Sequence, residues 1–307
     1  MCEYKSKSFD LCPVTFPIIP LNLGGPQDVT YAVARLDTLH PVVSGNKLFK
    51  LRYYLERYER EGGDGIVTFG GAYSNHLLAT ACACAERGIA CTGIVRGEAP
   101  AVPGPTLEDC RRYGMKLRFV SRGEYREMTR AAAASEGGTG LPPGALVIPE
   151  GGAGELGVMG ASLILASMPV ASSFSHILTA TGTGTTLRGI DRALLPGQSA
   201  VGIPVIGVPA PKREAFGGAL GCSEATRLVY DYAFGGYGRH TPELIAFMRG
   251  FYETQGIPTD IVYTAKAAFA LVDLDRRGYF PGGSRVLLLH TGGLQGNRSL
   301  PDGLIGF

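Results

Sequence analysis

Ala180-Thr181-Gly182-Thr183-Gly184-Thr185-Thr186 is the stretch that decides the fold. It follows an apolar run at 176–179 that is typical of a buried strand, and it precedes a helix predicted to start near Leu187. Backbone N–H groups at a helix start, beside glycines that allow close approach, form a phosphate site. The stretch lacks the lysine of a Walker loop and the spacing of the dinucleotide fingerprint, so it favours a monophosphate over ATP or NAD. Viewed alone, the stretch is weak evidence, and a plain tight turn is the alternative.

On both sides of this stretch, short apolar runs alternate with longer amphipathic ones, which is typical of parallel strands joined by crossover helices. The runs that predict further strands lie at 66–69, 91–95, 117–120, 146–148, near 205–208 and at 286–290. The runs that predict further helices lie at 48–61, 77–86, 105–113, 124–135, 155–168, 241–255 and 265–277. The fold class is therefore expected to be α/β, with parallel sheets flanked by helices.

The length of 307 residues exceeds the usual size of one domain, which favours two lobes that face a cleft. Pro149-Glu150-Gly151-Gly152 reads as a junction between lobes. Residues 48–148 are expected to form a small lobe inserted into a large one made of 1–47 and 149–307.

The amino-acid composition and net charge indicate which kinds of partner to expect. Hydrophobic residues make up 45% and charged residues 18% of the chain, and the net charge is +2. These values fit a globular protein and give no support to a nucleic-acid partner. No apolar run is long enough for a membrane span, and the first residues lack the apolar core of a secretory signal, so we expect a cytoplasmic protein without a membrane partner.

Two further stretches carry possible chemistry. In Ser44-Gly45-Asn46-Lys47, a lysine stands at the start of a helix, where the helix dipole disfavours its cation and favours the nucleophilic amine. The alternative is an ordinary solvated lysine. In the turn Gly70-Gly71-Ala72-Tyr73-Ser74-Asn75-His76, backbone N–H groups with Ser74 and Asn75 form a receptor for a carboxylate, and the alternative is a simple helix N-cap.

Cysteines and histidines give no sign of a metal site. The seven cysteines are Cys2, Cys12, Cys82, Cys84, Cys91, Cys110 and Cys222. Their number is odd and they lack paired CxxC spacing, so we expect buried or idle thiols rather than disulfides or zinc ligands. The histidines other than His76 are scattered without metal spacing. Lys212, Arg213 and Lys266 are expected to be surface or loop charges.

Taken together, these motifs resemble one family. The GNK lysine, the Ser74-Asn75 pair, the glycine-threonine stretch, Val262-Tyr263-Thr264-Ala265-Lys266 and His290-Thr291-Gly292-Gly293 occur in this order between residues 44 and 293. Their order and spacing resemble the pyridoxal 5'-phosphate (PLP) dependent family that contains 1-aminocyclopropane-1-carboxylate (ACC) deaminase and D-cysteine desulfhydrase. The resemblance implies PLP as cofactor, a homodimer, and the two-domain PLP fold type II, which is tryptophan synthase β-like. The large lobe would bind PLP.

The resemblance also assigns roles to residues. Lys47, rather than Lys50, would hold PLP as a Schiff base and later take the Cα proton, with Ser74 and Tyr263 orienting or shuttling protons and Tyr237 facing the substrate. Cofactor contacts are expected from Lys47, Asn75, Thr181, Gly182, Thr183, Gly184, Thr185, Thr186 and Thr291. Substrate contacts are expected from Tyr73, Ser74, Asn75, His76 and Thr264. Tyr73 replaces the glutamine that family members usually carry there.

Two departures from the family pattern distinguish its two activities. ACC deaminases carry a glutamate and a leucine where this chain has Thr264 and Thr291, and D-cysteine desulfhydrases resemble each other in having small hydroxyl residues at both places. A hydroxyl near the pyridine nitrogen makes the ring a weaker electron sink than a carboxylate does. We therefore expect β-elimination from D-cysteine or a related amino acid, which yields a keto acid, ammonia and sulfide.

Other functions stay open from the sequence alone. ACC deamination is the first alternative, followed by another reaction of fold type II such as β-replacement or racemisation. A protein that binds PLP or a phosphate ligand without catalysis is a remote alternative, because such a protein has no need for a helix-start lysine beside a carboxylate loop.

Overall fold

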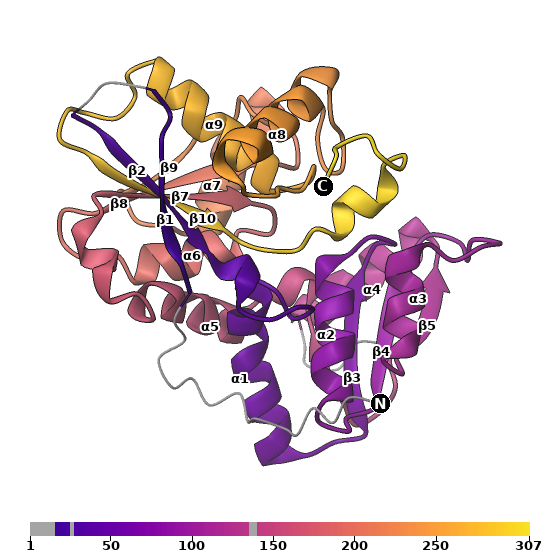
Figure 1. Ribbon diagram of the computed structural model, residues 1–307. Coiled ribbons are helices and arrows are strands. Elements are labelled where there is room, and N and C mark those ends of the chain that lie inside the picture. The colour runs from indigo at the N-terminus through magenta and orange to yellow at the C-terminus, as the bar shows by residue number, and fades with distance from the viewer. Residues whose placement is uncertain (1–15, 25–27, 135–139) are drawn as a thin grey trace.

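Two sheets, each flanked by helices, form the molecule, and the computed structural model describes residues 16–24, 28–134 and 140–307 (Figure 1). The larger sheet has the strand order β1-β2-β10-β7-β8-β9. Its strands are β1 (Ile18–Leu21), β2 (Thr30–Arg35), β7 (His176–Thr181), β8 (Ser199–Pro204), β9 (Thr226–Leu228) and β10 (Arg285–His290). All neighbouring pairs are parallel except β1 with β2.

The smaller sheet is wholly parallel and has the order β5-β4-β3-β6. Its strands are β3 (Gly65–Gly70), β4 (Cys91–Arg96), β5 (Lys116–Val120) and β6 (Ala145–Ile148). Parallel strands need crossover connections, which here contain helices. Helices near these strands are α1 (Asn46–Glu61), α2 (Asn75–Ala85), α3 (Pro105–Arg112) and α4 (Arg122–Ala134).

Helices of the larger sheet complete the fold. They are α5 (Glu155–Ala166), α6 (Thr185–Arg192), α7 (Arg213–Leu220), α8 (Pro242–Gln255) and α9 (Thr264–Arg276). Short 3-10 turns are η1 (Leu36–Thr38), η2 (Glu150–Gly152), η3 (Pro169–Ser173), η4 (Ala210–Lys212) and η5 (Gln295–Ser299). Because helices cover the sheets, central strands read as continuous apolar runs, and every residue of β3 is buried. The expected α/β class is confirmed.

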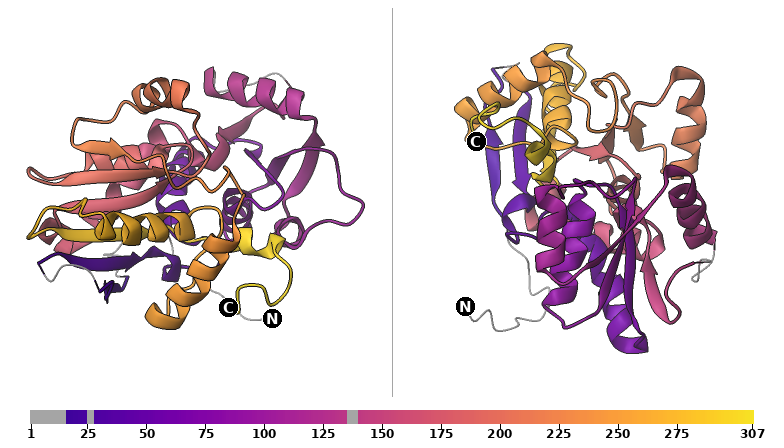
Figure 2. Two further views of the ribbon diagram at one scale, coloured as in Figure 1. Left: turned by 90° about the horizontal axis from the view of Figure 1, so that it is seen from above. Right: turned by 90° about the vertical axis from the view of Figure 1, so that its right-hand side faces the viewer.

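The two sheets use different segments of the chain, while the expected division into two lobes stays a prediction. Residues 65–148 supply all strands of the smaller sheet, and the segments before and after them supply the larger one. In both views of Figure 2 the purple smaller sheet stays apart from the orange helices of the larger one. Helix α1 packs closely on α5, where a side chain at Gly160 would meet the Phe49 carbonyl. The boundary at residue 48 stays a prediction, because α1 contacts both parts of the molecule.

Some elements differ from the sequence expectation. The strand expected near 205–208 is wrong: the strand is β8, which ends at Pro204. Gly202 and Pro204 are residue types common in loops, so the run at 199–204 was not recognised as a strand. Glycine is needed at position 202 because a side chain there would collide with Leu187. The expectations for Cys2 and Cys12 lie outside the described residues, and the other five cysteines are free. Among the helices of the described chain, none combines the length and apolar character that a bilayer crossing requires.

Candidate functional site

A cavity of about 470 Å³ lies where β3, β7 and β10 end. The turns after these strands supply much of its wall. Carboxyl ends of parallel strands are the usual place for a ligand in α/β proteins, because several turns converge there. Its lining includes Lys47, Ser74, Asn75, His76, Thr181, Gly182, Thr183, Gly184, Thr185, Thr186, Tyr237, Tyr263 and Thr291. The structure therefore brings thirteen of the fifteen predicted site residues to one cavity.

The glycine-threonine turn between β7 and α6 forms one wall. Gly184 has a φ of 81°, a left-handed conformation that suits glycine, and α6 starts directly after it. Gly182 faces Tyr263, and a side chain at this position would lie 3.3 Å from the tyrosine ring. The hydroxyls of Thr183 and Thr185 are 3.0 Å apart. The turn therefore offers a helix start, close backbone and hydroxyls, which are the features of an anion site.

Lys47 faces the same cavity as this turn. Gly45 has a φ of 64° and lies against the Thr291 backbone. A side chain at position 45 would come within 1.8 Å of the Thr291 carbonyl oxygen. The Asn46 backbone N–H donates to that oxygen at 3.0 Å. The Asn46 side chain donates to Thr186 Oγ1 at 2.8 Å and accepts from Lys47 Nζ at 2.9 Å. One amide thus links the lysine to the glycine-threonine turn.

Burial makes the Lys47 amine easier to deprotonate. It lowers the pKa of Lys47 to about 8, while the buried carboxylate of Asp260 acts in the opposite direction. Lys50 lies one helical turn further along α1 and donates to the Gly151 carbonyl at 3.1 Å. Burial first, and the charge of Lys47 second, hold the pKa of Lys50 well below its usual range. Two amines therefore face the cavity from one face of α1.

The turn after β3 forms the opposite wall. Ser74 Oγ accepts from the Leu77 N–H at 3.2 Å, so the N-cap interpretation is correct, and Ser74 also lines the cavity. The Asn75 amide donates to the Gly293 carbonyl at 3.2 Å, and its buried Oδ1 has no partner in the part of the chain that the structure describes.

His76 is fixed in one tautomer by its neighbours. The Thr68 hydroxyl donates to the Ile148 carbonyl at 2.9 Å, so its oxygen accepts from His76 Nε2 at 2.7 Å. His76 Nδ1 is then an acceptor, and it is buried without a partner from residues 16–24, 28–134 and 140–307. Burial, followed by the charges of Lys47 and Lys50, lowers the pKa of His76 well below its usual range. The imidazole is therefore neutral and adds no charge to the cavity.

Two tyrosines meet above the glycine-threonine turn. The hydroxyl of Tyr263 donates to that of Tyr237 at 3.4 Å, and the rings are 6.0 Å apart in an edge-to-face arrangement. Burial raises the pKa of Tyr263 well above its usual range, and desolvation beside the cavity also raises the pKa of Tyr237, although this residue is 46% exposed. Both hydroxyls stay protonated at neutral pH and can donate to a ligand in the cavity.

Two predicted site residues do not line the cavity. The hydroxyl of Thr264 donates to Asp260 Oδ1 at 2.8 Å and accepts from the Asp260 N–H at 2.7 Å, so it is engaged away from the cavity. Asp260 also accepts from the N–H groups of Val262, Tyr263 and Thr264. The side chain of Tyr73 is 39% exposed and lies beside Gly104. The expected substrate contacts of Thr264 and Tyr73 therefore have no counterpart in the cavity wall.

Sequence reasoning also missed residues of the site. Asn46, Arg96 and Glu150 line the cavity without having been predicted. Lys50 was set aside in favour of Lys47, although its spacing from Lys47 places both on one helix face. The expectation of a surface position for Lys266 is wrong, because its side chain is fully buried.

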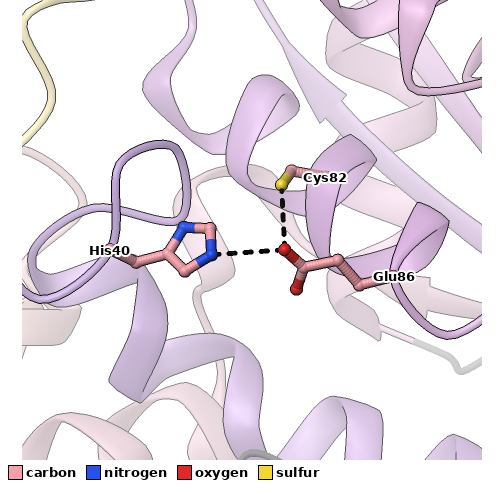
Figure 3. A group of neighbouring side chains, drawn as sticks. All are labelled: His40, Cys82 and Glu86. Atoms are coloured by element: carbon pink, nitrogen blue, oxygen red, sulfur yellow. Dashed lines mark hydrogen bonds and ion pairs between the residues drawn. The ribbon is translucent and has the colours of Figure 1, made fainter. Parts of the chain in front are cut away.

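A second polar group lies on the outer side of α2. Figure 3 shows His40, Cys82 and Glu86, with the Glu86 carboxylate between the imidazole at 3.2 Å and the thiol at 3.6 Å. His40 Nδ1 accepts from the N–H groups of Val42 and Val43, so the ring proton sits on Nε2 and faces Glu86. That nitrogen offers no lone pair to a metal. Burial raises the pKa of Cys82 to about 12, so its thiol stays protonated.

The cavity residues fit the cofactor that the sequence suggested. Buried polar atoms are normally paired, yet Asn75 Oδ1, His76 Nδ1 and Thr181 Oγ1 have no partner among the described residues, and all three residues line this cavity. A ligand with several polar groups would satisfy them. The Lys47 amine suits the aldehyde of PLP, and the Lys50 amine suits its phosphate.

Comparisons with known proteins agree with this geometry. A family model described as pyridoxal-phosphate dependent enzyme matches residues 16–292. A protein of Pyrococcus horikoshii named putative 1-aminocyclopropane-1-carboxylate deaminase is 32% identical over 86% of this chain and 84% of its own. A 1-aminocyclopropane-1-carboxylate deaminase of Methylobacterium sp. (strain 4-46) is 27% identical over 93% of this chain and 95% of its own.

Two solved structures are also similar to this chain. An ACC deaminase homologue is 28% identical, covers 95% of this chain and 93% of its own, and superposes with a TM-score of 0.76. A hydrogen sulfide-producing enzyme of Fusobacterium nucleatum covers 96% of this chain and 100% of its own, with a TM-score of 0.70. At 14% identity, this second likeness shows the fold alone.

Proposed function

Because the chain belongs to the family of pyridoxal-phosphate dependent enzymes, we propose that it eliminates the β-substituent of a small D-amino acid such as D-cysteine. The products would be a keto acid, ammonia and sulfide. The observation that carries the proposal is the link through Asn46 between Lys47 and Thr186 at one cavity, since a single PLP molecule needs both an amine and an anion site.

Each residue has a chemical task in this proposal. Bound PLP supplies an aldehyde for the amino group and an electron sink for the bond electrons at Cα. Lys47 holds the cofactor, and its amine, once free and neutral, accepts the Cα proton of the substrate. The turn at 182–186 binds the phosphate through backbone N–H groups and hydroxyls. A phosphate beside Lys50 favours its ammonium form, so Lys50 then adds a positive charge.

The substrate would lie between the turn after β3 and the two tyrosines. Ser74, Asn75 and His76 at the start of α2 line the cavity, and the N–H groups of a helix start suit the substrate carboxylate. Tyr237 and Tyr263 stay protonated because desolvation raises the pKa of each, so either can donate a proton or a hydrogen bond to the departing thiolate.

Charge around the cavity favours elimination of a good leaving group. Thr291 brings a hydroxyl to the cavity. Asp260, the buried carboxylate behind Thr264, already accepts from three backbone N–H groups and the Thr264 hydroxyl. Its oxygens are therefore already occupied by hydrogen bonds within the chain, so Asp260 is poorly placed to hold a pyridine nitrogen protonated. A weak electron sink suffices for expulsion of sulfide more readily than for opening of a cyclopropane ring.

ACC deamination is the second candidate, and the names of the relatives support it. The two activities separate in one assay, in which PLP-loaded protein receives D-cysteine, L-cysteine or ACC and keto acid and sulfide are measured. We expect keto acid and sulfide to appear together from D-cysteine at least ~10-fold faster than keto acid appears from ACC. A faster release from ACC would overturn the assignment in favour of ring-opening deamination.

The oligomeric state and location are part of the proposal. A homodimer is expected from the family resemblance, and light scattering at several concentrations measures it. A monomer at all concentrations would contradict this expectation. The cytoplasmic location also stays a prediction, which fractionation of the source cells tests.

A further inference from the structure

Lys266 is a buried cation that the proposed chemistry does not use. Its side chain is fully buried within α9. The Nζ donates to the carbonyls of Gly236 at 2.7 Å, Ala233 at 2.8 Å and Val205 at 3.5 Å. An ammonium group has three protons, and three backbone carbonyls lie within hydrogen-bond distance to accept them. Two of these carbonyls belong to the loop that carries Tyr237.

The surroundings of Lys266 explain why a cation is tolerated there. Burying an unpaired ammonium is costly, and carbonyl dipoles offset that cost when every proton is accepted. Burial lowers the pKa of Lys266 to about 8, and attraction by Asp260 acts in the opposite direction. The ammonium form therefore predominates at neutral pH, which keeps all three hydrogen bonds.

The loop that Lys266 contacts adopts an unusual backbone conformation. Gly235, Gly236 and Gly238 have φ values of 85°, 113° and 67°, and Phe234 has a φ of 48°. Phe234 is the single non-glycine residue with positive φ among residues 16–24, 28–134 and 140–307. Glycine-rich backbone of this kind has many alternatives in solution, so a fixed conformation needs an anchor.

A second buried charge, Asp260, holds the segment that carries Tyr263. Asp260 accepts from the backbone N–H of Tyr263 at 3.2 Å, and Lys266 donates to the carbonyl that immediately precedes Tyr237. One anion and one cation thus fix two chain segments whose side chains meet at the cavity. The two hydroxyls lie 3.4 Å apart only while both segments stay in place.

We propose that Lys266 is a positioning residue that anchors the loop 233–237 and thereby holds Tyr237 beside Tyr263 over the cavity. Its effect on turnover rests on the proposed function, in which Tyr237 contacts the substrate. Its effect on the loop does not, so the loop is measured first and without a reaction.

The chain contains no tryptophan, which makes a single reporter possible. Tyr237→Trp places one at the tip of the loop, and acrylamide quenching of its fluorescence measures exposure in the PLP-free and PLP-loaded protein. Residue 237 is already 46% exposed, so adding Lys266→Met is expected to raise the quenching constant by ~1.5-fold to ~2-fold when the loop is released. Lys212→Met, which removes an exposed lysine of the same lobe, is the matched control and leaves the constant unchanged. An unchanged constant in folded Lys266→Met protein overturns the anchor.

Conservative variants guard against a failure to fold. Lys266→Arg keeps a cation with several donors, and it is expected to keep the quenching constant close to that of the Tyr237→Trp protein. Should Lys266→Met not give a folded protein by circular dichroism, Lys266→Gln replaces it, because Gln keeps two N–H donors without the charge. Higher quenching in Lys266→Gln than in Lys266→Arg supports the anchor, and equal quenching contradicts it.

A double-mutant cycle separates positioning from general damage. With the fastest substrate found, Lys266→Met should lower kcat/KM ~10-fold in the natural background and less than ~2-fold beside Tyr237→Phe, since the loop no longer carries the hydroxyl. Equal losses in both backgrounds would show a role unrelated to Tyr237. If D-cysteine is not a substrate while the quenching result holds, the proposed function fails and the anchor stands.

Discussion

Lys47 and Lys266 have similar basicity and opposite surroundings. Burial lowers the pKa of each to about 8. Lys47 lines a cavity and donates to the single side-chain oxygen of Asn46, whereas Lys266 is enclosed and donates to three backbone carbonyls. A low pKa therefore does not by itself identify a reactive lysine. What distinguishes the reactive one is a free path from its amine to a cavity that also contains an anion site.

The largest expected effect comes from Lys47→Ala. Removing the amine should abolish the visible absorbance of protein-bound PLP and lower turnover by at least ~10³-fold, because the residue holds the cofactor and takes the proton. The free energy of unfolding should not fall, since a buried amine with one hydrogen bond is removed. Absorbance titration, steady-state kinetics and urea unfolding measure these effects. Retained turnover would show that Lys47 is not the reactive lysine.

Lys266→Met is expected to show the converse pattern. It leaves three buried carbonyls without their donor, so the free energy of unfolding should fall by about 2 kcal/mol. Bound PLP should keep its visible absorbance, because Lys266 does not line the cavity. Urea unfolding beside Lys212→Met measures the loss. A variant as stable as the natural protein would show that the three hydrogen bonds contribute nothing.

Lys50 is the third buried amine, and its substitution tests whether it binds the cofactor phosphate. Lys50→Met should weaken PLP binding about 10-fold, or ~1.4 kcal/mol, through the loss of one positive charge at the anion site. Turnover at saturating PLP should change little. Equilibrium titration of cofactor-free protein measures the affinity, with Lys116→Met on the exposed edge of the smaller sheet as control. Unchanged affinity would remove Lys50 from the site.

The pH dependence of labelling separates the two lysines of the comparison. A neutral amine reacts with formaldehyde and borohydride, and with a pKa of about 8 the neutral fraction of Lys47 in cofactor-free protein rises ~10-fold between pH 7 and 9. The rate should therefore rise with pH and level off above 9. Lys266 should stay unlabelled in the folded protein because it is enclosed. Peptide mass spectrometry follows both, and a flat Lys47 profile would contradict its lowered pKa.

The smallest effect is expected far from the cavity. Glu86→Gln removes the carboxylate between His40 and Cys82 and should change the free energy of unfolding by less than ~1 kcal/mol, since the group is partly exposed. Turnover should stay the same. A loss of activity as large as that of Lys50→Met would show that this group acts on the site after all.

Much of the fold follows from local patterns. The buried strand β3 is a largely apolar run, and β4 has an apolar centre, so the sequence locates both to within a residue or two. Strands β1 and β2 were missed because they form the edge of the larger sheet through pairing with distant residues. Strand β8 was misplaced because Gly202 and Pro204 resemble loop residues, and its helix neighbour α7 was overlooked.

The site shows the same division between local and distant causes. Lys47, Ser74 and the turn at 182–186 are local signals, since each stands at the start of a helix. The positions of Thr264 and Lys266 depend on partners far along the chain or on the folded loop, such as the carbonyl of Val205. No pattern near residue 266 tells that three carbonyls surround its amine, so only the folded chain shows a buried anchor there.

The most direct measurement of the central claim is borohydride reduction of the PLP-loaded protein followed by peptide mapping. Reduction fixes the cofactor covalently to the lysine that holds it, and trypsin no longer cleaves after that lysine. The account predicts the added mass on one fragment, residues 36–50, with the modification at Lys47. Modification at Lys50, at Lys266 or at no lysine would contradict it.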